Sequence, residues 1–185
     1  VKSNGHHNFE AAVRFICSKL SNGVFVSYRN SLDNVTSIHV PTRLYSHLEN
    51  TDEVYSIAHQ EFAYYNSVDF SLNEHYVKTK AVEGNTAFRF CEQTGILVIS
   101  SIPGDSFNYD LSGVKAVLIR PYHSGTINTS DGALGRFCEK VRAKNIPVFI
   151  LSCNLSADYE STNVFREFGI TKLPLSTFVS QYMKL

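Results

Sequence analysis

The chain has 185 residues, and its 17 Lys and Arg residues balance 17 Asp and Glu residues, so the formal net charge is zero. This length lies above the usual domain size of roughly 100–150 residues and predicts one domain or slightly more. Balanced charge gives no reason to expect a nucleic acid as partner. No apolar run approaches the roughly 20 residues of a membrane-spanning helix, so we expect no membrane association either.

The N-terminal sequence "VKSNGHHNFEAAVRF" has neither the basic start nor the apolar centre of a signal peptide. We therefore expect a cytoplasmic protein, and the start at Val1 suggests a chain cut from a longer one. The cysteines lie in or beside apolar stretches without metal-like spacing, which predicts small buried side chains in a reducing compartment. They are Cys17, Cys91, Cys138 and Cys153. We expect no metal site and no cofactor.

The first part of the chain predicts one helix and two strands. Apolar residues at 9, 12, 13, 16, 17 and 20 follow the helical period, with Asn8 as cap and Asn22-Gly23 as the end. The stretches "GVFVSYR" and "NVTSIHV" predict strands, and "TRLYSHLEN" a short helix or an ordered loop. We interpret residues 1–60 as the tail of an α/β N-terminal domain. Residues 61–88 lack a clear period and are expected to be a connection.

The second part alternates regularly between strands and helices. The stretches "GILVISS", "VKAVLIRPY" and "IPVFILSC" predict strands, and "DGALGRFCEKVRAKN", "DYESTNVFREFG" and "PLSTFVSQYMKL" predict helices, the last capped by Ser176. Continuous apolar strands of this kind indicate a parallel sheet covered on both faces. Residues 89–185 therefore predict a three-layer, Rossmann- or flavodoxin-like α/β domain. Its predicted core contains Ile96, Leu97, Val98, Val117, Leu118, Ile119, Val148, Phe149 and Ile150.

The loop "YHSGTINTS" after the second of these strands is the best candidate for a binding site. Open α/β sheets bind their ligands at the carboxyl ends of the strands. Gly125 allows the backbone to approach a ligand closely, and Thr126 and Asn128 offer short donors and acceptors for an amide or a carboxylate. From the residues alone, a binding loop and an ordinary connecting loop are equally well supported.

The order of these segments resembles the C-terminal domain of bacterial-type L-asparaginases and of the related glutaminase–asparaginases and tRNA-dependent amidotransferases. The loop "YHSGTINTS" is similar to the family's Tyr-x-x-Gly-x-x-Asn form, and "FREFGITKLPLSTFVSQYMKL" to the family's C-terminal end. The segment "SNGHHN" resembles the family's Ser-Asp-Gly-Pro-x-Asn, with Asn4 in place of Asp and His6 in place of Pro. The resemblance runs over nearly the whole chain but includes no single decisive motif.

The resemblance implies a hydrolase that converts asparagine to aspartate and ammonia, working as a homodimer or homotetramer on a small amino-acid amide. Asparagine and glutamine both remain open as substrates. The family's threonine nucleophile would lie upstream of Val1, so no catalytic residue is expected within this chain. The family's lysine would fall near His39 or Val40, where no lysine stands. Asn128 matches the asparagine that a neighbouring subunit offers to the site, with Thr126 and Gly125 in the same loop.

Two interpretations therefore remain open. The chain is either the C-terminal part of an L-asparaginase-type amidohydrolase, inactive when alone, or a non-catalytic α/β binding or interaction module that kept the asparaginase scaffold. The missing lysine near His39 favours the module, and the abrupt start at Val1 favours the enzyme.

Overall fold

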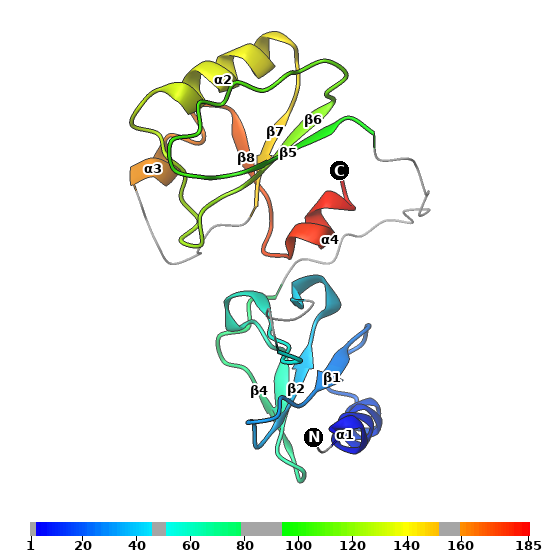
Figure 1. Ribbon diagram of the computed structural model, residues 1–185. Helices are drawn as coiled ribbons and strands as arrows, with labels where there is room; N and C mark the ends of the chain where they lie inside the picture. Colours follow the sequence, from blue (N-terminus) through cyan, green and yellow to red (C-terminus); the bar gives the residue numbers. More distant parts are fainter. Residues whose placement is uncertain (1–2, 46–50, 79–93, 152–159) are drawn as a thin grey trace. The chain divides into compact units, whose positions relative to one another are not determined.

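The chain consists of two compact units, Val1–Lys80 and Ala81–Leu185, each with its own four-stranded sheet. The computed structural model describes residues 3–45, 51–78, 94–151 and 160–185, and Figure 1 labels its helices and strands. We call Val1–Lys80 unit 1 and Ala81–Leu185 unit 2.

Unit 1 is an antiparallel sheet in the order β1-β2-β3-β4, with one long helix packed on it. Its elements are α1 (Gly5–Ser18), β1 (Val26–Tyr28), β2 (Thr36–His39), the 3-10 turns η1 (Pro41–Arg43) and η2 (Ile57–His59), β3 (Ala63–Tyr65) and β4 (Phe70–Leu72). The helix buries Ala11 and Phe15 against Ile38 of the sheet, and the rings of Phe25, Phe62 and Phe70 surround Phe15. Edge-to-face aromatic contacts of this kind make up much of the small core.

Two expectations for unit 1 are corrected, and a third agrees with the described residues. Residues 63–72, expected to belong to a connection, form β3 and β4, and β3 pairs with β2. The helix begins at Gly5, three residues before the expected cap Asn8, and it ends at Lys19 in a left-handed conformation rather than at Asn22-Gly23. The stretch expected to be a short helix or an ordered loop begins with the last two residues of the 3-10 turn η1 and continues in extended backbone at Leu44, so its described part is an ordered loop.

Unit 2 is a parallel sheet in the sequential order β5-β6-β7-β8, as the alternation of strands and helices predicts. Its elements are β5 (Ile96–Ser100), β6 (Ala116–Arg120), α2 (Ala133–Ala143), β7 (Val148–Ile150), α3 (Glu160–Asn163), β8 (Ile170–Lys172) and α4 (Phe178–Tyr182). The strand β8 was not predicted; it pairs with β7 through Val148 and Ile170. The α/β fold class predicted from the sequence is confirmed.

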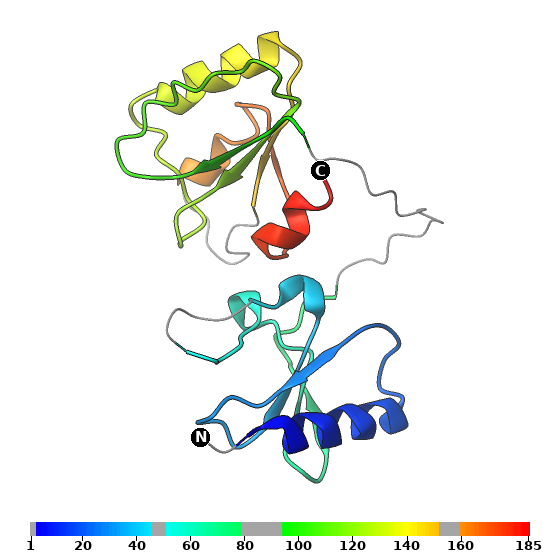
Figure 2. The same ribbon diagram turned by 45° about the vertical axis from the view of Figure 1, so that its right-hand side comes forward.

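Both faces of the unit 2 sheet are covered. Right-handed crossovers in a sequentially ordered parallel sheet place every connection on the same face. Accordingly, Phe107 of the β5–β6 loop, Leu134 of α2 and Phe165 after α3 share one buried cluster with Val117 and other core residues. Figures 1 and 2 show α4 on the other face, where the Arg120 guanidinium lies 4.7 Å from the centre of the Phe178 ring.

The predicted core is largely correct. Five of its residues are buried: Val117, Leu118, Ile119, Val148 and Ile150. The other four are half-buried: Ile96, Leu97, Val98 and Phe149.

Two helix ends differ from expectation. The regular part of α3 stops at Asn163, well before Gly169, and α4 is capped by the side chain of Thr177, which accepts from the Ser180 N–H, instead of by Ser176.

The two cysteines whose side chains the structure describes differ in exposure. Cys17 is exposed, which corrects the expectation that it is buried, whereas Cys138 is buried as expected; Cys91 and Cys153 lie outside the described residues. Burial raises the pKa of the Cys138 thiol to about 11, so little thiolate forms at neutral pH. We expect iodoacetamide to alkylate Cys17 in the folded chain while Cys138 reacts only after denaturation, as peptide mass spectrometry would measure. Equal labelling of both residues in the folded chain would contradict this assignment.

Candidate functional site

The loop between β6 and α2 consists of a tight turn and of a buried residue, Ile127, that follows it. The Tyr122 N–H donates to the Thr126 carbonyl at 2.9 Å, and the Gly125 N–H donates to the Tyr122 carbonyl at 2.8 Å. Gly125 has φ +78°, a left-handed conformation that a residue without Cβ adopts most readily. Ile127, only 3% exposed, is buried in the core of unit 2. The two backbone hydrogen bonds and the buried Ile127 therefore hold this turn at the carboxyl end of β6.

Asn128 is held by short-range hydrogen bonds. Its Nδ2 donates to Oδ2 of Asp131 at 2.9 Å, and its Oδ1 accepts from the N–H of Ser130 at 3.1 Å and from the Ser130 hydroxyl at 2.8 Å. Oδ1 of Asp131 in turn accepts from the Ala133 N–H at 2.9 Å, so the same carboxylate caps the start of α2. The amide of Asn128 is half-exposed and already oriented. A group held in this way loses little conformational entropy when it binds a ligand.

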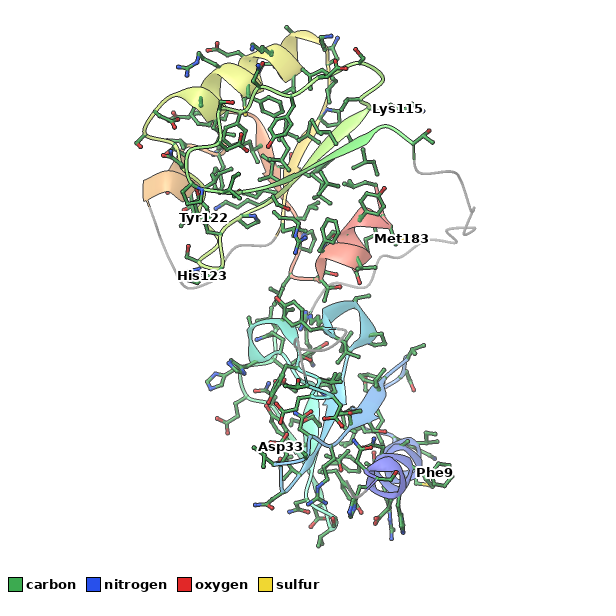
Figure 3. The ribbon with its side chains drawn as sticks, in the orientation of Figure 1. Phe9, Asp33, Lys115, Tyr122, His123 and Met183 are labelled. Carbon is green, nitrogen blue, oxygen red and sulfur yellow. The ribbon has the colours of Figure 1, made fainter. Side chains whose placement is uncertain are left out.

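The other two predicted site residues lie in the same turn. The hydroxyls of Thr126 and Ser124 are 2.8 Å apart and share a hydrogen bond, and the backbone of Gly125 is buried between them. Figure 3 labels Tyr122 and His123 in this loop. The loop thus combines two hydroxyls and one amide, which donate and accept hydrogen bonds without carrying a charge.

Sequence reasoning missed Ser101, which lies beside this loop at the end of the neighbouring strand β5. Its N–H donates to the carbonyl of Arg120 at 2.9 Å, which extends the pairing of β5 with β6 by one residue. The Ser101 Oγ is buried and has no hydrogen-bond partner among the described residues. A buried hydroxyl without a partner costs free energy, and such atoms often mark a site that a ligand or water completes. No sequence signal distinguishes this serine from Ser100.

A polar site in the β5–β6 loop is explained by folding alone. The Tyr109 hydroxyl donates to Oδ2 of Asp105 at 2.6 Å, and Oδ1 of Asp105 accepts from the N–H of Phe107 at 2.8 Å. Partial burial, together with this bond and the negative charge of Asp105, raises the pKa of Tyr109 to about 12. Asp105 therefore orders the loop that carries Phe107 into the core, and we assign it no role in binding.

The segment "SNGHHN" also has a structural function. Asn4 Nδ2 donates to the carbonyl of Arg29 at 2.9 Å, and Asn8 Oδ1 accepts from the Arg29 N–H at 2.8 Å. The hydroxyl of Ser27 donates to the carbonyl of Asn8 at 2.7 Å. These bonds fix the start of α1 to Ser27 of β1 and to the backbone of Arg29, the residue that follows this edge strand.

His39 lies where the resemblance places a lysine, and it is 1% exposed. Its Nδ1 is 2.8 Å from the hydroxyl of Ser56, and its Nε2 is buried without a partner among the described residues. Burial lowers the pKa of His39, and the nearby carboxylate of Glu61 opposes the shift only in part. The neutral imidazole is therefore the stable form at neutral pH, and it cannot replace the positive charge of a lysine.

Within the described ranges, no three His, Cys, Asp or Glu side chains are grouped as metal ligands. A search of the same residues found no helix long and apolar enough to cross a membrane.

No protein-family model matches the chain, and no curated protein matches it in sequence. L-asparaginase I from Vibrio cholerae O1 biovar eltor is similar over 100% of this chain, with a TM-score of 0.66 and 16% sequence identity. The thermostable L-asparaginase from Thermococcus kodakarensis also matches 100% of the chain, with a TM-score of 0.56 and 18% identity. The chain spans 56% of the length of each of these structures. Along its whole length, the chain thus has the fold of a little more than half of an L-asparaginase.

Proposed function

We propose that the chain is the C-terminal part of an L-asparaginase-type amidohydrolase, which hydrolyses asparagine to aspartate and ammonia in the full-length protein. The observation that carries the proposal is the similarity of the whole chain to two L-asparaginase structures from unrelated organisms. The resemblance found in the sequence supports it independently, because it rests on the loop and C-terminal motifs and not on the fold.

In this proposal the β6–α2 loop of one subunit completes the active site of another. Asn128 would offer its amide to the bound amino-acid amide, and Thr126 and Gly125 would shape the turn that presents it. The bonds from Asn128 to Ser130 and Asp131 support this role because they orient the amide before any substrate binds. The reaction itself needs donors for the oxyanion and an activated hydroxyl as nucleophile, and the resemblance places that hydroxyl upstream of Val1.

The proposal predicts that the chain 1–185 alone does not release ammonia from asparagine or glutamine. An unassisted serine or threonine hydroxyl is a weak nucleophile, and the resemblance places the family's threonine nucleophile upstream of Val1. The test is a coupled ammonia assay of the purified chain against a buffer blank. Ammonia release that disappears on substitution of a residue within 1–185 would refute the proposal that the nucleophile lies elsewhere.

The alternative function, a non-catalytic module, is favoured by one observation. At the position that the resemblance assigns to the family's lysine, the chain has a buried, neutral histidine. The codons upstream of Val1 distinguish the two proposals. A strand that ends in a Thr-Gly-Gly-Thr-like turn, followed later by a Thr-Asp-Thr segment, would favour the enzyme, and its absence would favour the module.

We also propose that the chain self-associates, because α1 carries an apolar stripe on its outer side. Its residues recur at the a and d spacing of a helix pair and are all exposed, from 42% to 76%. They are Phe9, Val13, Ile16 and Leu20. A stripe of this kind is self-complementary across a two-fold axis, and the zero net charge of the chain does not oppose association.

The stripe predicts a concentration-dependent dimer in light scattering or sedimentation. We expect Ile16→Glu to shift the dissociation constant upward at least about tenfold, since each 1.4 kcal/mol of lost apolar burial changes it tenfold. Val179→Glu is the matched control, because Val179 is 66% exposed on α4 of unit 2. A monomeric wild-type chain, or equal effects of both substitutions, would contradict association through α1.

A further inference from the structure

A polar cluster is buried on the face of the unit 1 sheet that lies opposite α1. We define it as His39 of β2, Ser56, Glu61 and Tyr64 of β3. His39, Ser56 and Glu61 are each at most 5% exposed. Besides the contact of Ser56 with His39, Oε1 of Glu61 accepts from the Ser56 N–H at 3.1 Å, and Oε2 accepts from the Tyr64 hydroxyl at 3.4 Å. Such a cluster in so small a core is unusual, because buried charged groups are stable only when they are well paired.

The segment 56–61, which joins Ser56 to Glu61, has an unfavourable backbone. Ala58 has φ 52° and ψ 36°, and His59 has φ 53°, so two consecutive residues with side chains adopt the left-handed conformation. This conformation persists only where surrounding contacts enforce it. The polar cluster holds both ends of the segment, and Nδ2 of Asn73 donates to the carbonyls of His59 and Glu61 at 2.9 and 2.8 Å. The buried side chain of Gln60 adds three bonds: it accepts from the Arg43 guanidinium and from the Val77 N–H, and it donates to the His75 carbonyl.

The environment of His39 makes the contact between sheet and segment sensitive to protons. A neutral imidazole satisfies Nδ1 through Ser56, while its Nε2 lies buried without a partner. A second proton would place a charged N–H donor in the interior with no acceptor. The carboxylate of Glu61 is the charged group that acts on His39, and within the sheet His39 pairs with Val26 of β1.

We propose that His39 is the proton-sensitive latch of unit 1: protonation of its ring releases the strained segment 56–61 from the sheet. The inference does not depend on the proposed hydrolase function. Once the segment opens, water solvates the imidazolium, and Ala58 and His59 relax to ordinary backbone conformations. The polar cluster, and not the aromatic core beneath α1, is therefore the part of unit 1 that responds to pH.

The direction of the effect follows from the lowered pKa of His39. Its ordinary value is 6.5, and burial lowers the value in the closed state. Between these two pKa values, the open state, in which segment 56–61 has left the sheet, therefore binds more protons than the closed state. Closed-state stability is full above pH 6.5 and decreases as the pH falls from 6.5 toward the lowered value. Within that window, the ratio of open to closed segment increases about tenfold for each pH unit.

Nuclear magnetic resonance of the isotope-labelled chain 1–185 tests the latch between pH 8 and pH 5. We expect the His39 ring to titrate below 6.5, and the amide signals of residues 56–61 to shift or broaden with the same midpoint. The amides of α1 and of unit 2 should not follow that midpoint. His39→Gln removes the titrating ring and should abolish the transition in residues 56–61, whereas His75→Gln, a change at an exposed histidine, should leave it intact.

The wild-type titration decides the proposal even if His39→Gln does not fold. Amides 56–61 that stay constant while the His39 ring titrates would overturn it. So would a loss of all unit 1 signals at one midpoint, because that would be acid unfolding of the whole unit. A transition that persists in a folded His39→Gln variant would assign the response to another group.

Discussion

In the full-length protein, Asn128→Ala is expected to lower kcat/KM for asparagine by about 10²–10³-fold, the usual effect of removing one donor that is positioned at a reacting carbonyl. The melting temperature should change little. The bonds of Asn128 are short-range and partly exposed, and substitutions at such surface positions typically change stability by about 0.5 kcal/mol. The measurement pairs steady-state kinetics with thermal unfolding of the same protein preparation.

Ser130→Ala is the matched control for Asn128→Ala. It removes the hydroxyl that donates to Asn128 Oδ1 at 2.8 Å, while the bond from Asn128 to Asp131 remains. We expect kcat/KM to fall by less than about tenfold, because a neutral hydrogen bond contributes roughly 0.5–1.5 kcal/mol. Equal losses in both variants would make Asn128 a structural residue of the turn. Unchanged kinetics in Asn128→Ala would remove it from the site altogether.

Phe165→Ala is expected to destabilise unit 2 by about 3–5 kcal/mol, the range observed for removal of a large buried aromatic side chain. Phe165 is 0% exposed and belongs to the same buried cluster as Leu134 and Val117. Most other members of this cluster come from α2 and from strands of the sheet, so they cannot collapse into the cavity without shifting a helix or a strand. Denaturant unfolding should therefore show a lower midpoint for unit 2.

The control for Phe165→Ala is Val179→Ala on α4, since Val179 is 66% exposed and its truncation should be almost neutral. Hydrogen exchange distinguishes the two compact units. In Phe165→Ala, the amides of β6 and β7 should exchange faster and those of β2 should not. A cost below about 1 kcal/mol, well under the range for buried aromatic residues, would mean that the core is packed differently.

The sequence predicts most of the parallel sheet because β5, β6 and β7 are continuous runs of three or more apolar residues. The strand β8 lacks such an apolar run, since only Ile170 of its three residues is buried. The strands β3 and β4 also lack a continuous apolar run, because they contain tyrosine, serine and an exposed leucine. Their pairing with β2 depends on contacts between residues distant in sequence, which local periodicity does not contain.

The position of the candidate loop was predictable, whereas its hydrogen bonds were not. A strand followed by Gly125 and short polar residues marks the loop in the sequence. The bond between Asn128 and Asp131 and the unpartnered hydroxyl of Ser101 depend on backbone geometry at the strand ends. Likewise, "SIHVPTR" marks His39 as a departure from the family, but only the folded sheet buries its ring against Ser56.

Mixing two inactive variants of the full-length protein tests directly whether the loop of one subunit completes the active site of another. One variant has Asn128→Ala, and the other has alanine in place of the threonine nucleophile. After subunit exchange at equal amounts, we predict recovery of about a quarter of wild-type activity for a dimer with two shared sites, because half of the dimers are mixed and each has one intact site. No recovery, in a mixture in which labelled subunits are shown to have exchanged, would contradict the claim.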